Sequence, residues 1–150
     1  MHHKFIAETE SLEPAFERLI NCVPFASGKL MPKVGVYLFS EDGQHRYVGR
    51  SNNICQRYGQ HTRPGSPYNQ ASFANLMAMR QLGYKASYRP GEGKKMRESE
   101  EFRIAFEQAK DRIRKMEFRA VDETEPVRQA LLEIYCAVVL GTEFNGFDNH

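Results

Sequence analysis

The feature that most constrains the fold is a β-hairpin signal between residues 34 and 50. Val34–Phe39 is rich in β-branched and aromatic residues, which favour a strand. Asp42-Gly43 is typical of a tight hairpin turn, and the returning strand is expected over His45–Arg50. Side chains alternate between the two faces of a strand, and pairing across the turn is expected to bring Tyr37 and Tyr47 to one face.

Helical patterns occupy most of the remaining chain. Apolar spacing and capping residues predict helices over Ser11–Ile20, Asn52–His61, Gln70–Leu82, Glu98–Lys115 and Thr124–Gly141. Glu117–Val121 is predicted as a third strand and Lys85–Tyr88 as a short one, and Arg89–Lys95 is predicted to be a loop. This order of strands and helices indicates an α/β domain.

A length of 150 residues is that of a single domain. Within it, residues 1–33 are interpreted as a helical extension, and residues 62–116 as a basic, partly helical insertion. The longest apolar run is Ile134–Leu140, far short of the ~20 residues that a membrane helix needs. A membrane partner is therefore not expected.

The cysteines point to a reducing compartment. Cys22, Cys55 and Cys136 are odd in number and far apart, and they contain no CxxC pair, so neither a zinc site nor a disulfide framework is indicated. The first ten residues, MHHKFIAETE, lack the apolar core of a secretory signal. A cytoplasmic protein with reduced thiols is expected.

Charge is unevenly distributed along the chain, although the formal net charge is only +2. Residues 43–91 contain seven Lys or Arg and no Asp or Glu, whereas residues 120–150 are net acidic. A long acid-free stretch favours a surface that faces a polyanion, and the alternative is ordinary solvated side chains. Acids beside a basic region also fit a metal site next to a phosphate-binding surface.

Two Tyr-Gly neighbourhoods, Gly35–Tyr37 and Tyr47–Gly49, stand ten residues apart on the predicted hairpin. Arg57 follows ten residues after Tyr47, and His61 four residues later, so both lie on one face of the predicted helix. Two phenols, a guanidinium and an imidazole supply hydrogen-bond donors, a permanent cation and a titratable group. That combination suits chemistry on an oxyanion.

These residues, in this order, resemble the motif of the GIY-YIG nuclease family, with valine replacing isoleucine in both half-motifs. The resemblance extends to Glu133, within the last predicted helix, and to Asn145, twelve residues later. It covers roughly Val34–Asn149, and the segment 145–150 is similar to the same region of type II restriction enzymes of this class. It implies an α+β fold with a small three-stranded, mainly antiparallel sheet flanked by helices and a helical insertion.

The resemblance implies a hydrolase that cuts phosphodiester bonds with one metal ion. Glu133 would hold Mg²⁺, or Mn²⁺ as a substitute, and Arg57 would clamp the phosphate oxygens as charge builds up. Tyr37 is expected to activate water, with its ionised form favoured by the nearby cation and metal. Tyr47 would position that water and His61 would assist proton transfer, unless its ring only caps the helix.

The surroundings of Glu133 and Asn145 are also expected from the sequence. The neighbours of Glu133 one turn away are mostly small, and Leu131, Leu132, Ile134 and Val138 are expected to anchor the helix. Asn145 would brace the site by hydrogen bonding. We expect the side chains of the site to face one shared cleft, with Asn145 at its edge.

DNA contacts are expected mainly from the basic insertion. The candidates for phosphate contacts are Arg50, Arg63, Arg80, Lys85, Arg89, Lys94, Lys95 and Arg97. The candidates for reading bases are Tyr68, Asn69, Gln70 and Ser72.

The sequence therefore predicts a magnesium-dependent endonuclease of restriction type that acts on double-stranded DNA. Cutting both strands at a symmetric site requires a homodimer or two sequential events. Within the same chemistry, the alternative is a structure-selective repair or recombination nuclease, or a mobile-element nuclease. Outside it, the alternatives are a non-catalytic DNA-binding module, or a protein-interaction domain that uses the helix around Phe102 and Phe106.

Overall fold

The structure is a computed structural model that describes residues 1–26, 30–84 and 91–146. The chain separates into two compact units: the first comprises Met1–Tyr58 and Met116–Asn145, and the second contains Gly59–Lys115. The second unit covers nearly the same residues as the insertion expected at 62–116, and that this segment is an insertion stays a prediction. That the whole chain is one domain stays a prediction. None of the described helices is long and apolar enough to cross a membrane.

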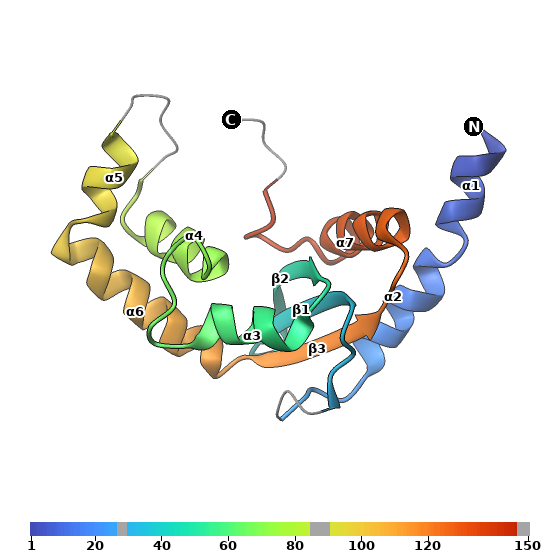
Figure 1. Cartoon of the computed structure of the whole chain (residues 1–150), viewed down its shortest axis with the longest axis horizontal. Coiled ribbons are helices and arrows are strands. Elements are labelled where there is room, and N and C mark those ends of the chain that lie inside the picture. Colours follow the sequence, from blue (N-terminus) through green and yellow to red (C-terminus); the bar gives the residue numbers. More distant parts are fainter. Residues whose placement is uncertain (27–29, 85–90, 147–150) are drawn as a thin grey trace. The chain divides into compact units, whose positions relative to one another are not determined.

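The first unit is built on a three-stranded antiparallel sheet, which confirms the α+β class with a small sheet flanked by helices. Strands β1 (Gly35–Glu41), β2 (Gln44–Ser51) and β3 (Glu117–Asp122) lie in the order β2-β1-β3 (Figure 1). The turn between β1 and β2 is Asp42-Gly43, with φ values of 51° and 78°. Positive φ at both positions matches the twist of a two-residue hairpin, as the sequence predicts.

The pairing of β1 with β2 shifts by one residue next to the turn. Ser40 pairs with His45, but Phe39 pairs with Tyr47, so Arg46 is an extra residue on β2. Such a bulge exchanges the faces of all residues that follow it along the strand. Beyond the bulge, Tyr47 and Gly49 point to the same face as Phe39 and Tyr37.

Two helices cover one face of the sheet. Helices α2 (Leu12–Asn21) and α7 (Pro126–Leu140) pack against each other and against the strands. Their shared core consists of Leu12, Ala15, Phe16, Leu19, Val36, Leu38, Val48, Val121, Leu132, Cys136 and Ala137. The strand residues in this core alternate with Tyr37 and Gly49, which therefore point to the other face.

An aromatic cluster occupies that other face. Tyr58, from helix α3 (Ile54–Thr62), lies 4.7 Å from Phe118 and 6.1 Å from Phe39 between ring centroids. Tyr37 adds an edge contact to Phe39 at 5.9 Å. Asn53 starts α3, because its side-chain oxygen accepts a hydrogen bond from the Gln56 backbone N–H at 3.2 Å. This cluster fixes the first turns of α3 against the sheet.

The first and last helices differ from the sequence-based expectation. Helix α1 (His3–Thr9) was not predicted, and Glu8 at its end pairs with Arg128 of α7 at 2.9 Å. The N-cap of α7 is Glu125 and not Thr124, because the Glu125 carboxylate accepts from the Arg128 backbone N–H at 2.9 Å. A carboxylate at this position also suits the positive end of the helix dipole.

The second unit is helical where the structure describes it. Helix α4 (Ser72–Gln81) packs on α6 (Glu100–Arg114), which Ser99 caps as its side chain accepts from the Phe102 N–H. Helix α5 (Glu92–Arg97) occupies part of the predicted loop Arg89–Lys95, which corrects that prediction. Its residues after the glycines are good helix formers, so two glycines did not prevent a short helix. The strand expected at Lys85–Tyr88 lies outside the described residues.

The close approach of β1 to β3 at Gly35 generates a testable prediction. A β-carbon on Gly35 would lie 1.9 Å from the Val121 carbonyl oxygen, which belongs to the paired strand and has nowhere to move. We expect Gly35→Ala to lower the free energy of unfolding by about 1–3 kcal/mol or more, as overpacking does. Gly65→Ala is the control, since nothing lies within 4 Å of that position. Urea denaturation with equal midpoints for both variants would contradict the prediction.

A candidate active site at the β1–β2 hairpin and α3

Tyr37 and Arg57 form the centre of the candidate site. Tyr37 is 1% exposed, and the half-buried Arg57 donates a side-chain hydrogen bond to its hydroxyl oxygen. Burial raises the pKa of Tyr37 well above its ordinary value, and the neighbouring Tyr47 raises it further. The positive charge and the hydrogen bond of Arg57 act in the opposite direction and are outweighed. The phenol is therefore protonated at neutral pH.

The activation of water expected of Tyr37 stays a prediction, and the neighbouring groups of the chain itself do not favour it. Activation of water by Tyr37 requires a phenolate, and the pKa moves away from the one that such a base needs. The positive charge of Arg57 lowers the pKa of Tyr37, as predicted, but desolvation raises that pKa by more. In this structure Tyr37 acts on Arg57, whose guanidinium it holds in place.

The glycine of the second half-motif has a structural reason. Tyr37 pairs directly with Gly49 across the two strands. A β-carbon on Gly49 would lie 2.3 Å from the hydroxyl oxygen and ring of Tyr37. The phenol therefore packs over bare backbone, which explains why a tyrosine and a glycine face each other here.

Tyr47 reaches the same face because of the bulge at Arg46. It is half-buried, whereas Tyr37 is closed off from solvent. The two phenols interact electrostatically, which places them near each other. The expectation that both tyrosines share a face agrees with the strand register, and Tyr47 is the member with access to solvent.

Glu133 lies on α7 and forms an ion pair with β2. Its Oε2 lies 2.8 Å from Arg50 Nε, and the Glu133 side chain is 28% exposed. Burial raises the pKa of Glu133, and the charge and hydrogen bond of Arg50 partly reverse that rise. Of the residues expected to anchor the helix, Leu132 is buried, but Ile134 and Val138 are 47% and 67% exposed, which corrects that expectation.

Tyr37 and Glu133 come from opposite faces of the sheet, whereas the side chains of the site are expected to face one shared cleft. Tyr37 points to the aromatic face of the sheet, whereas α7 packs on the opposite face. The negative charge of Glu133 still raises the pKa of Tyr37, so the two groups lie close enough to interact. The edge strand β2 carries both Tyr47, on the aromatic face, and Arg50, which pairs with Glu133 on the α7 face.

His61 lies four residues after Arg57 on α3, beyond the boundary of the first unit. Its side chain is fully buried, at 0% exposed. An enclosed imidazole does not reach a phosphate, so proton transfer by His61 to substrate has no support in this geometry. A structural role in the last turn of α3 agrees with its burial.

Asn145 braces the edge strand. Its Oδ1 accepts from the Val48 N–H at 2.8 Å, and its Nδ2 donates to the Val48 carbonyl at 2.7 Å. Thr142 Oγ1 donates to the same Oδ1 at 2.8 Å. Val48 lies between Tyr47 and Gly49, so this double hydrogen bond fixes the strand at the second half-motif, in agreement with the bracing expected for Asn145.

A metal ion would find one protein carboxylate in this site. Within the described residues no group of three or more His, Cys, Asp or Glu comes together. Mg²⁺ commonly keeps several waters and binds one or two carboxylates together with phosphate oxygens, so it needs no such group. Glu133 is partly exposed and is the residue that would hold the ion, and the donor set fits an ion completed by water and substrate.

The candidate DNA-binding residues are mostly on the surface. Those that are exposed are Arg50, Arg63, Tyr68, Asn69, Gln70, Arg80, Lys94 and Lys95. Arg97 is partly buried, because its guanidinium stacks 4.4 Å from the centre of the Tyr68 ring. Ser72 is half-buried in α4, and Lys85 and Arg89 lie outside the described residues.

Sequence reasoning missed the role of Lys110, which supports these residues in the second unit. Its buried Nζ donates to the Pro64 carbonyl at 2.5 Å and to the Ser66 carbonyl at 3.0 Å, and it pairs with Glu107 at 2.9 Å. These bonds fix the segment that leads to Tyr68. The signal was present, because Lys110 falls four residues after Phe106 in the apolar stripe of α6.

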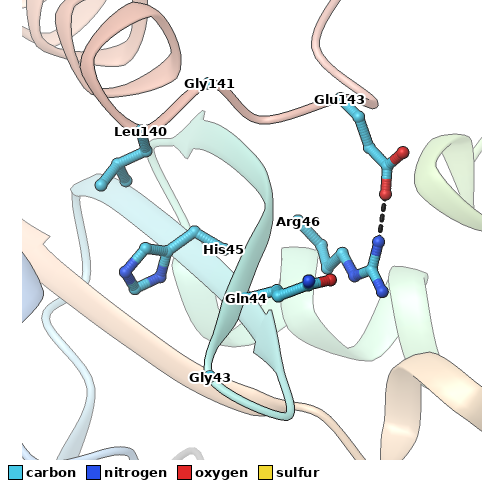
Figure 2. A pocket seen from close by; sticks show the side chains of 7 residues that line it. All are labelled: Gly43, Gln44, His45, Arg46, Leu140, Gly141 and Glu143. Carbon is cyan, nitrogen blue, oxygen red and sulfur yellow. Dashed lines mark hydrogen bonds and ion pairs between the residues drawn. The ribbon is translucent and has the colours of Figure 1, made fainter.

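An open pocket of about 480 Å³ lies at the tip of the hairpin, apart from the candidate catalytic residues. It is lined by Gly43, Gln44, His45, Arg46, Leu140, Gly141 and Glu143. Figure 2 shows the Arg46 side chain directed towards Glu143, with which it forms an ion pair, and away from the ring of His45. Arg46 also pairs with Glu41 at 3.2 Å, so the bulged residue is held from two elements.

Comparisons of the sequence with family models and curated proteins, and of the structure with solved structures, found no match.

The raised pKa of Tyr37 predicts how stability changes in alkaline solution. Above about pH 10 the phenol ionises in the unfolded chain but not in the folded one, so rising pH favours unfolding. Wild type should lose up to about 1.4 kcal/mol per pH unit more than Tyr37→Phe, which lacks this group. Urea unfolding of both proteins from about pH 9 to about pH 11.5 measures the difference. A difference that stays constant over this range would show that Tyr37 ionises as easily in the folded state.

Proposed function

We propose that this chain is a metal-dependent endonuclease with the GIY-YIG fold, which hydrolyses phosphodiester bonds of double-stranded DNA at specific sequences. One observation carries the proposal: Arg57 donates a hydrogen bond to Tyr37, and Tyr47 and the distant Glu133 of α7 both act electrostatically on the same phenol. A guanidinium that donates to a phenol, together with a half-buried carboxylate whose charge reaches that phenol, suits the binding of a phosphate and a divalent ion. We place this activity in the cytoplasm, where free thiols stay reduced.

The proposed chemistry assigns each group by its environment. Bound at Glu133, Mg²⁺ or Mn²⁺ would neutralise the scissile phosphate and stabilise the leaving oxygen. Arg57, oriented by the protonated Tyr37, donates to the non-bridging oxygens of the phosphate. Because its guanidinium is already fixed, it loses little conformational entropy when the phosphate binds. Tyr47 is the phenol with access to solvent and positions the attacking water. Asn145 holds the strand that carries Tyr47.

Sequence preference is proposed to come from the second unit. Tyr68, Asn69 and Gln70 are exposed on a segment that is fixed by Lys110, and a fixed segment reads base edges more selectively than a mobile one. Exposed Lys94 and Lys95 supply phosphate contacts, which carry no sequence information. This combination favours the restriction type over a structure-selective nuclease, which needs no base readers.

Digestion of linear duplex DNA tests the function. With Mg²⁺ we expect discrete fragments that share an end sequence, and with chelator no cleavage. Glu133→Gln should abolish cleavage and leave folding intact, because burial already disfavours the charged form of this carboxylate. Glu8→Gln is the control, since Glu8 also pairs with an arginine of the first unit but lies on α1. Cleavage by Glu133→Gln at the wild-type rate would reject the mechanism, and cleavage confined to branched DNA would reject the restriction type.

Arg57 and the surface lysines should differ in kinetics. Arg57→Ala is expected to lower the single-turnover rate by about two to three orders of magnitude, as loss of a transition-state charge stabiliser does. Lys94→Ala or Lys95→Ala should leave that rate unchanged. Each should lower the slope of log affinity against log salt concentration by about one, because one phosphate contact is lost. Single-turnover cleavage and binding titrations at several salt concentrations separate the two effects. An Arg57→Ala variant that loses affinity but keeps its rate would make Arg57 a binding residue only.

A further inference from the structure

The ion pair between Arg50 and Glu133 has a consequence for how metal and DNA bind, and it rests on the function proposed above. Arg50 follows Tyr47–Gly49 on β2 and pairs with Val36, so it points to the face that α7 covers. Its Nε lies 2.8 Å from Glu133 Oε2. The carboxylate proposed to hold the ion is thus already engaged by a guanidinium.

The electrostatics of Glu133 explain why a cation occupies this position. The carboxylate is partly withdrawn from water, which disfavours its charged form, and Arg50 is the neighbour whose charge and hydrogen bond offset that cost. A divalent ion would satisfy the same carboxylate. Two cations that depend on one carboxylate repel each other, so the ion and Arg50 compete for Glu133.

The exposure of Arg50 allows it to separate from Glu133. The Arg50 side chain is 47% exposed, and an ion pair with this much access to solvent is weak and easily separated. A released guanidinium on the edge strand stays beside the carboxylate that the ion has taken. There it can donate to a phosphate bound at that ion, the geometry for which a planar guanidinium is suited.

We propose that Arg50 is a placeholder for the metal ion: it pairs with Glu133 in the metal-free protein and, once an ion binds, moves to the DNA phosphate. Without the ion, Arg50 is neutralised by Glu133 and contributes little to DNA binding. With the ion, both the ion and Arg50 face the phosphate. Metal and DNA therefore bind with positive coupling, and each raises the affinity for the other by the same factor.

The first experiment measures Mn²⁺ binding to the DNA-free protein by calorimetry or electron paramagnetic resonance. Arg50→Gln should bind Mn²⁺ about two- to five-fold more tightly than wild type, because the competing ion pair is gone. Arg128→Gln is the matched control: Arg128 Nε lies 2.9 Å from Glu8 Oε2, with side chains that are 42% and 34% exposed. It should bind Mn²⁺ like wild type.

The second experiment separates release of Arg50 from a general change in charge. The affinity for a short DNA duplex is measured in chelator for wild type, Glu133→Gln, Arg50→Gln and the double variant. When Arg50 is present, Glu133→Gln should raise the affinity for DNA several-fold. It should also increase the salt slope, which is the slope of log affinity against log salt concentration, by about one. In the Arg50→Gln background the same change should leave the salt slope unaltered, since there is no guanidinium to release.

The outcomes distinguish this proposal from the function on which it rests. If Glu133→Gln loses Mn²⁺ but Arg50→Gln binds it like wild type, the metal site stands and the exchange is wrong. If Glu133→Gln keeps the Mn²⁺ affinity of wild type, the metal site itself fails, and the proposed function with it. Equal effects of Glu133→Gln on the salt slope in both backgrounds would also overturn the exchange.

Discussion

The candidate site depends on a single extra residue in β2. Counted from the turn without the bulge, Tyr47 would pair with Leu38 and point into the core beneath α7, and Gly49 would no longer lie under the Tyr37 ring. The bulge at Arg46 reverses these faces, and Arg46 is held by Glu41 and Glu143. The ion pairs at the tip of the hairpin therefore stabilise the register on which the tyrosines, the glycine and the contact with Arg57 depend.

Burial, more than charge, sets the behaviour of the titratable groups. Desolvation is the largest cause of the raised pKa values of both Tyr37 and Glu133, although each has an arginine beside it. A buried phenol that stays protonated is a poor base but a good partner for a guanidinium. A carboxylate that burial destabilises when charged binds a cation readily, whether that cation is an arginine or a metal ion.

The sequence predicts the local parts of this fold and site better than the parts that depend on packing. The hairpin follows from Asp42-Gly43 and the alternation in Val34–Phe39, and the pair Asn52-Asn53 predicts the start of α3 to within one residue, because these signals lie within a few residues of each other. The bulge has no such signal, since it is defined by pairing between strands. The spacing of Arg57 and His61 is that of one helix face, but their burial depends on what packs there, so the imidazole expected in a shared cleft is enclosed.

The ion pair between Arg50 and Glu133 is another contact that the sequence does not predict, and it bears on the proposed function. In the sequence Arg50 is one of many exposed cations in an acid-free stretch, and its partner lies more than eighty residues away. A charge count assigns it to DNA, whereas the structure assigns it to a carboxylate. Both assignments hold if Arg50 alternates between Glu133 and a DNA phosphate. While Arg50 neutralises Glu133 it adds no attraction for DNA, and it becomes available when a metal ion takes its place at Glu133. Under the proposed exchange, a surface charge count would overestimate the DNA affinity of the metal-free protein, and binding of the ion would restore the difference.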